Sequence, residues 1–134
     1  MVDALRRALG MLTLDGIVVD VHPTAAASAI EVEAEITGYV EACDAPLRHA
    51  AAGAALAAVV GQGLFAIDQA VEFTFYTYGD TIEELRNYVQ ENWNDARLDD
   101  ATVSRTRDAL RRSRGARPRS RERVVVTTLR RGRA

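Results

Sequence analysis

Residues 12–23 read Leu-Thr-Leu-Asp-Gly-Ile-Val-Val-Asp-Val-His-Pro, and this stretch carries most of the information about the fold. Its second half, Ile17–Val21, has apolar residues on both faces of an extended chain. Polar side chains join only near its end, as Asp20 and His22. A short run of this kind is typical of a central strand that is covered on both sides.

An amphipathic helix is predicted before this strand, from Val2 to Gly10. Its apolar side chains recur three or four positions apart and form one stripe: Val2, Leu5, Leu9 and Leu12. Helix, glycine turn and buried strand in this order indicate an α/β protein.

The next predicted elements are a surface strand and a hairpin. Residues Ala29–Ile36 alternate, with apolar side chains predicted inward and Glu31, Glu33 and Glu35 predicted outward. Thr37-Gly38 favours a turn, after which Tyr39–Ala42 would return as the hairpin partner.

Four elements are predicted in the second half. They are a helix from Ala45 to Gly61 capped by Asp44, a strand from Gln69 to Tyr78, two capped helices, and a last strand from Arg123 to Arg130. Thr81 and Glu84 form a capping box for the first of these two helices, and Asp99-Asp100 begins the second.

Composition predicts one domain over residues 1–134 and excludes several classes of protein. The single Cys43 cannot form an internal disulfide, which favours a cytoplasmic protein. No zinc-binding spacing of Cys and His is present, so we expect no metal site. The start of the chain does not read as a signal peptide. The uncharged run Ala50–Ile67 is too rich in Ala and Gly for a membrane span, so we expect no membrane partner.

Charge is strongly polarised along the chain. All 17 basic residues are arginine; residues 1–104 carry 5 of them against 17 acids, and residues 105–134 carry 12 against 2 acids. The segment Arg111–Arg123 holds seven arginines and predicts an Arg-rich loop, the one stretch whose composition allows flexibility. A solvated basic tail, nucleic-acid binding and pairing with an acidic face of another copy all fit this pattern.

The helix, the Leu-x-x-Gly turn and the strand ending in Val-Asp-Val-His-Pro resemble the C-terminal half of class I methyltransferases, which use S-adenosylmethionine. The order of the later elements also agrees with that family, over nearly the whole chain. The resemblance implies a partial Rossmann-like three-layer fold with a mixed sheet, and the hairpin would be an addition. It also implies that Val124–Leu129 lies between Ile17–Val21 and Val71–Tyr78, antiparallel to the latter.

This chain departs from the family where the cofactor would bind. The resemblance calls for a Gly-x-Gly-x-Gly loop after a first strand, and Gly61-Gln62-Gly63 instead ends a helix. We therefore assign no cofactor, no cofactor-binding residue and no catalytic residue. His22, Tyr76 and Tyr78 occupy places where the family often puts substrate-side residues, and they are the pocket candidates. A polar strand end for His22 and a helix-covered face for the tyrosines are the alternatives.

Three functions follow as hypotheses. The first is a truncated methyltransferase-like domain without independent catalysis that acts as a homodimeric or partner-binding assembly unit. The second is a subunit of a split methyltransferase whose cofactor half is a separate chain, in which case the protein would be a transferase. The third is nucleic-acid binding through the Arg-rich end. Residues 105–133 contain no aromatic residue that could stack on bases, which argues against this hypothesis.

Overall fold

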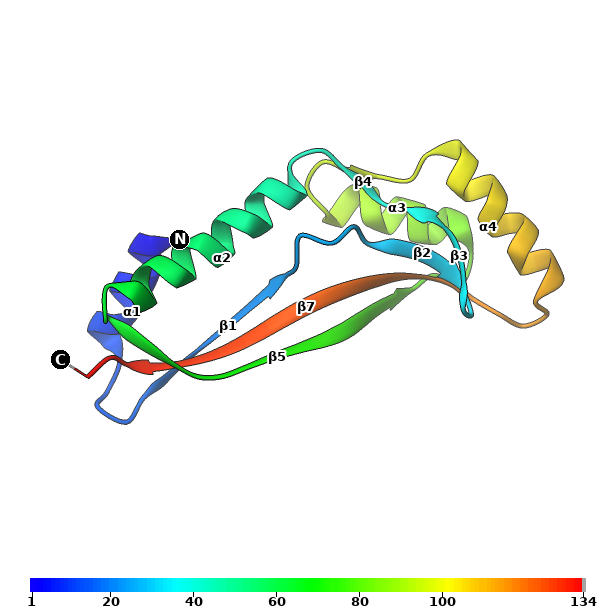
Figure 1. The fold of residues 1–134 in the computed structure, drawn as a ribbon. Coiled ribbons are helices and arrows are strands. Elements are labelled where there is room, and N and C mark those ends of the chain that lie inside the picture. The colour runs from blue at the N-terminus through cyan, green and yellow to red at the C-terminus, as the bar shows by residue number, and fades with distance from the viewer. Residues whose placement is uncertain (134) are drawn as a thin grey trace. The chain divides into compact units, whose positions relative to one another are not determined.

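The computed structural model describes residues 1–133. Along the chain these residues form α1 (Val2–Met11), β1 (Ile17–Pro23), β2 (Ala29–Val32), β3 (Glu35–Tyr39), β4 (Glu41–Ala42), α2 (Ala45–Gly61), β5 (Phe65–Tyr78), α3 (Ile82–Asn92), β6 (Ala96–Arg97), α4 (Asp100–Arg112) and β7 (Pro118–Arg131) (Figure 1). They divide into two compact units. Unit 1 contains residues 1–24, 47–73 and those from 124 onward, and unit 2 contains residues 25–46 and 74–123. The fold is therefore α/β, with four helices and antiparallel strand pairs.

The sheet of unit 1 has β7 between β1 and β5. β1 pairs antiparallel with β7, in a register that runs from Ile17 opposite Arg130 to Pro23 opposite Val124. On its other side β7 pairs with β5, and the N–H of Gly132 donates to the carbonyl oxygen of Leu64 at 2.9 Å where these strands meet. The predicted strand order is confirmed.

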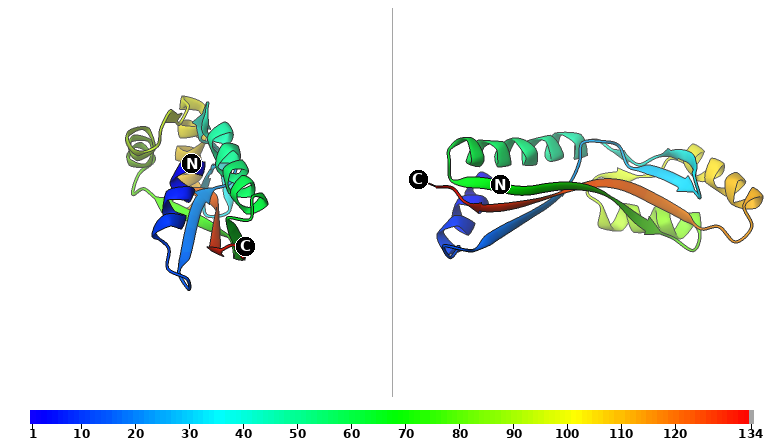
Figure 2. Two further views of the ribbon diagram at one scale, coloured as in Figure 1. Left: turned by 90° about the vertical axis from the view of Figure 1, so that its left-hand side faces the viewer. Right: turned by 60° about the horizontal axis from the view of Figure 1, so that its bottom comes forward.

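One face of this sheet is covered by α1 and α2, which lie along the strands (Figures 1 and 2). The cluster between helices and sheet contains five buried side chains: Leu5, Leu56, Val59, Phe65 and Leu129. Small side chains let α2 approach closely, and Ala55 is itself buried. The predicted bounds of α2 are confirmed.

The other face of the unit 1 sheet is open. Ile17, Val19 and Val21 share this face of β1 because they alternate with Val18, which packs in the cluster beneath the helices. Their exposed fractions are 49%, 54% and 58%. The prediction of a strand covered on both sides is wrong, and unit 1 has two layers where three were expected. Alternation of side chains cannot show whether a second helical layer exists.

Unit 2 contains a tight hairpin that the sequence pattern concealed. The predicted strand Ala29–Ile36 is broken, because β2 ends at Val32 and β3 begins at Glu35. Glu33 makes the turn with a left-handed φ of 55°. β2 lies between β7 and β3, and Glu31, predicted to point outward, is only 2% exposed. The predicted turn Thr37-Gly38 lies within β3, whose last residue, Tyr39, pairs with Ala29. The rest of the predicted hairpin partner contributes β4, which pairs with β6.

The helices of unit 2 begin at the predicted caps. The side chain of Thr81 accepts a hydrogen bond from the N–H of Glu84 at 3.1 Å, and the carboxylate of Asp99 accepts one from Thr102 at 2.8 Å. Both interactions satisfy donors that a helix leaves unpaired in its first turn. The buried core of unit 2 contains eight apolar side chains: Ile30, Val40, Ile82, Leu85, Val89, Ala96, Leu98 and Val103.

The Arg-rich segment is mostly regular structure. α4 continues to Arg112, and β7 begins at Pro118, five residues earlier than predicted. Only residues 113–117 lie outside a helix or strand, so the predicted loop over 111–123 is wrong. Pairing with β2 holds the first residues of β7 in an extended conformation, with Ala29 opposite Arg121 and Val32 opposite Pro118.

Candidate functional site

Arginine and tyrosine side chains gather on one face of unit 2. In Arg119–Arg123 every second residue is arginine, and alternate residues of a strand point to the same face. Register with β2 places Glu31 opposite Arg119 on that face. We call this surface the Arg–Tyr face; its members are Glu31, Tyr76, Tyr78, Arg117, Arg119, Arg121 and Arg123.

Glu31 is the centre of the Arg–Tyr face. Its side chain is 3% exposed, and its Oε1 accepts hydrogen bonds from Nε of Arg119 at 2.8 Å and lies 2.7 Å from Nη2. Its Oε2 lies 3.6 Å from Nε of Arg121, which is beyond the length of an N–H···O hydrogen bond. One buried carboxylate thus faces two guanidinium groups, and Arg121, with 41% of its side chain exposed, keeps much of its charge uncompensated.

The tyrosines pack against the same arginines. The guanidinium carbon of Arg119 lies 4.2 Å from the ring centroid of Tyr76, and that of Arg117 lies 5.5 Å from the ring of Tyr78. Arg119 also donates to the Tyr78 hydroxyl at 3.0 Å. This hydrogen bond, more than the interaction with Glu31, raises the pKa of Arg119 above its ordinary value. Cation–π contacts of this kind hold the rings and the guanidinium groups in one arrangement.

Both rings remain accessible. Tyr76 is 38% exposed and Tyr78 is 47% exposed, and their centroids are 6.3 Å apart. A helix does not bury them, so the alternative of a helix-covered face is wrong. The structure brings these two candidate residues together with arginines from a strand that begins forty residues later.

A shallow hollow adjoins the face. Its volume is about 420 Å³, and it is lined by Ala26, Ala27, Thr74, Arg121 and Arg123. The two alanines leave room for a ligand to approach, and the hydroxyl of Thr74 can donate a hydrogen bond. Guanidinium groups beside a hydroxyl suit an anion with oxygen acceptors, such as a phosphate or a carboxylate.

His22, the third candidate, belongs to unit 1. Its Nδ1 lies 2.6 Å from Oδ2 of Asp20, and both side chains are largely buried. An Asp–His pair of this kind orients the imidazole. His49 lies near His22. Burial lowers the pKa of His49 most, and the charges of Arg48 and His22 lower it further. Within residues 1–133, no group of three or more His, Cys, Asp or Glu side chains is arranged to hold a metal ion.

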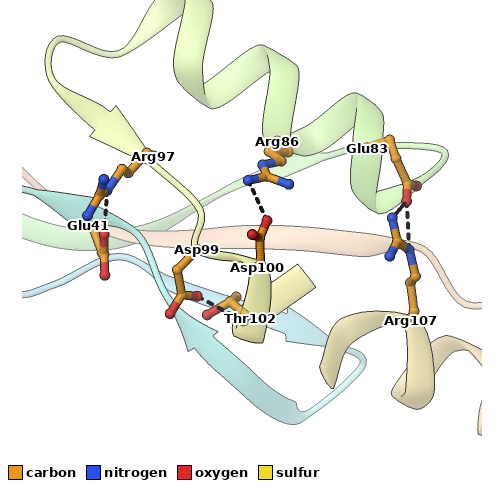
Figure 3. Close-up of polar contacts among 8 residues, drawn as sticks. All are labelled: Glu41, Glu83, Arg86, Arg97, Asp99, Asp100, Thr102 and Arg107. Carbon is orange, nitrogen blue, oxygen red and sulfur yellow. Dashed lines mark hydrogen bonds and ion pairs between the residues drawn. The ribbon is translucent and has the colours of Figure 1, made fainter. Parts of the chain in front are cut away.

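The charge polarity of the sequence is largely compensated within the units. Acidic residues of the first part pair with arginines of the last part, as Glu31–Arg119, Glu35–Arg112, Asp68–Arg130, Asp80–Arg117 and Glu83–Arg107. Figure 3 shows Glu83 with Arg107 and Arg86 with Asp100, which join α3 to α4. Exposed pairs contribute at most about 1 kcal/mol each, so they orient elements more than they stabilise them. The basic end is therefore not a uniform solvated tail.

Sequence reasoning missed Glu31 and the grouping of arginines with tyrosines. The period of two in Arg117, Arg119, Arg121 and Arg123 was a signal that these residues lie on one face of a strand. No local pattern could show that β2 would bring Glu31 beside them, because that pairing is long-range.

No protein-family model, curated protein or solved structure matches this chain. None of the helices formed by residues 1–133 has the length and apolar character that spanning a membrane requires.

Proposed function

We propose that this chain is an assembly unit without catalysis of its own, which pairs with a second copy through the open face of unit 1. The observation that carries the proposal is the exposure of Ile17, Val19 and Val21, each about half accessible on one face of one strand. Contiguous apolar surface of this kind marks interaction sites in soluble proteins.

The strand order supports a relationship to the methyltransferase fold as part of the same proposal. β7 lies between β1 and β5 and runs antiparallel to β1, as the family's seventh strand does between its fifth and sixth. In that family a strand would continue the sheet beyond β1 and a second helical layer would cover the open face. Among residues 1–133, β1 pairs with β7 alone. Residues 1–133 form neither such a strand nor such a layer, and they leave both the apolar face and the edge of β1 exposed.

A second copy is the favoured occupant because the middle of the open face is uncharged and can complement itself. The charge of Arg130, which lies opposite Ile17 at the end of this face, is already paired with Asp68. Across β7 this face continues through Val126 and Thr128, opposite Val21 and Val19. A two-fold axis brings identical patches together, and such isologous contacts are the commonest in oligomers. Face-to-face packing of two sheets, about 10 Å apart, would replace the missing helical layer. Burial would stabilise the dimer by roughly 1 kcal/mol for each half-exposed Val or Ile.

Two other ways to cover this surface are less well supported. The hairpin that contains Ile30 does not cover the free edge of β1, because β2 pairs with β7 and β3. The Ala-rich helix α2 could also pair with a second copy, but it uses its Ala55, Leu56 and Val59 side for the core of unit 1. The remaining alternative is a separate chain that supplies a cofactor half and pairs with the edge of β1. The experiments below must distinguish this alternative from a homodimer.

Light scattering coupled to size exclusion tests the proposal on the full chain at micromolar concentrations. We expect a dimer mass for the parent and a monomer for Val19→Asp, because the substitution puts a charge into the contact. Leu14→Asp is the matched control, since Leu14 is 87% exposed outside the sheet, and it should remain dimeric. A parent that is monomeric at high micromolar concentration, in low and high salt alike, would overturn the proposal.

Calorimetry with S-adenosylmethionine tests the absence of cofactor binding separately. We expect no heat of binding. A dissociation constant of about 10 μM or tighter, about −7 kcal/mol, would contradict an assembly unit and support an enzyme.

A further inference from the structure

We propose that the Arg–Tyr face of unit 2 binds single-stranded nucleic acid, with phosphates on the arginines and unpaired bases on the tyrosine rings. This inference rests on unit 2 alone and is independent of the pairing proposed for unit 1. The objection from sequence was that residues 105–133 contain no aromatic residue for stacking. Strand pairing removes that objection, because β5 supplies Tyr76 and Tyr78.

The cations are placed for a chain of phosphates. Alternate residues of a strand lie about 6.6 Å apart, so Arg119, Arg121 and Arg123 form a row about 13 Å long. Glu31 compensates one charge for two arginines, and it bonds closely only to Arg119. Positive charge therefore remains at Arg121, at the wall of the hollow. A row of guanidinium groups beside an open hollow fits an extended polyanion better than an enclosed small molecule.

The rings favour single strands over duplexes. Base stacking requires an accessible aromatic face and a base that is not already stacked on its neighbours. Tyr76 and Tyr78 are exposed beside the arginines, and Arg119 holds both side chains by a hydrogen bond and a cation–π contact. A platform that is already ordered loses little side-chain freedom when a base binds.

Three of the arginines of α4 contribute little to this surface charge because each pairs with a carboxylate, and the fourth, Arg105, is held by neutral oxygens. Arg105 donates to the carbonyl oxygen of Thr37 at 2.6 Å, and the other pairs are Arg107–Glu83, Arg111–Asp108 and Arg112–Glu35. The inference therefore depends on β7, and a variant of β7 can test it.

Fluorescence anisotropy with a labelled oligothymidylate is the experiment, on the full chain at several salt concentrations. We expect binding that weakens as salt rises, with Arg121→Gln lowering the slope against the logarithm of salt by about 0.7. Tyr76→Leu should weaken binding about tenfold, and Tyr76→Phe, which keeps the ring, should bind as the parent does. Arg130→Gln is the matched control: it lies on the same strand, pairs with Asp68 in unit 1, and should leave affinity unchanged.

Circular dichroism of each variant ensures that only folded protein is compared. No binding at low salt would overturn the inference. The inference would also be overturned if Arg121→Gln and Tyr76→Leu lost no more affinity for the oligonucleotide than Arg130→Gln does. A labelled duplex bound as tightly as the single strand would show that the tyrosines do not stack on bases. Equal competition by a nucleoside monophosphate and by the oligonucleotide would show a small-anion site instead.

Discussion

Glu31→Gln should make unit 2 less stable and yet bind single-stranded nucleic acid more tightly. Glutamine keeps the shape of the side chain and one carbonyl acceptor, but it removes the negative charge that faces Arg119 and Arg121. The two effects have opposite signs because the same charge stabilises the folded chain and repels a phosphate.

The loss of stability follows from the contacts of one buried carboxylate. Nε and Nη2 of Arg119 both lie within 2.8 Å of Oε1 of Glu31. Only the bond from Nε is a hydrogen bond to the carboxylate, because Nη2 donates to the carbonyl oxygen of Glu33. A hydrogen bond to a charged acceptor contributes about 1 kcal/mol more than a neutral one, so Glu31→Gln should lose about 1 kcal/mol. Complete removal of the carboxylate in Glu31→Ala would leave the guanidinium of Arg119 with neutral partners only, the Tyr78 hydroxyl and the Glu33 carbonyl oxygen, and should cost about 3 kcal/mol.

The gain in affinity follows from Coulomb's law. A phosphate about 6 Å from the carboxylate is repelled by about 0.7 kcal/mol in water, which corresponds to about threefold in the dissociation constant. Water screens the repulsion less at this partly buried position, which would make the change in the dissociation constant larger than threefold.

Urea unfolding and anisotropy measure the two quantities on the same sample, at a temperature at which the variant is folded. Glu35→Gln is the matched control, because Glu35 pairs with Arg112 on the surface and should change stability by less than about 0.5 kcal/mol. Glu31→Gln that is as stable as the parent would refute the role of Glu31 in holding Arg119. Weaker binding by a folded Glu31→Gln would refute the placement of phosphates beside Arg121.

Two further predictions concern packing and pH. Gly38→Ala should destabilise by about 2 kcal/mol because the added Cβ would overlap the side chain of Thr102. Gly53→Ala should stabilise by about 0.5–1 kcal/mol, because Gly53 lies inside α2 and a Cβ there meets nothing within 4 Å. Urea unfolding measures both changes, and equal effects would contradict the close approach of α4 to β3. Burial raises the pKa of the Glu122 carboxyl, so the folded chain disfavours its ionised form. Glu122→Gln should therefore increase the free energy of unfolding at neutral pH, and the gain should vanish as pH falls below the ordinary carboxyl range, near about 4.3. A gain that is the same at acid and neutral pH would show that burial of charge is not its cause.

The elements that local patterns define were predictable. The stripe that begins at Val2 and Leu5 identified α1, the caps at Thr81 and Asp99 marked the starts of α3 and α4, and the small residues before Gly61 marked α2. These signals work because helix periodicity and first-turn hydrogen bonds depend on residues a few positions apart. The order of β1, β7 and β5 also followed, but from a resemblance and not from the residues themselves.

Three features depended on tertiary structure. Alternation in Ala29–Ile36 could not reveal the turn at Glu33, which joins the paired strands β2 and β3. Nor could it reveal the burial of Glu31, which depends on the pairing of β2 with β7. The candidate tyrosines were named, but their grouping with Arg119 needed β5 and β7 to lie side by side.

The sequence alone determined that Ile17–Val21 is an apolar strand, and the tertiary structure decided that one of its faces is open. An apolar side chain shows only that a surface can be buried against another apolar surface. Whether helices, a second copy or water meets it depends on which other elements exist and on where the chain places them. That information is spread over the whole fold, so no window of the sequence contains it.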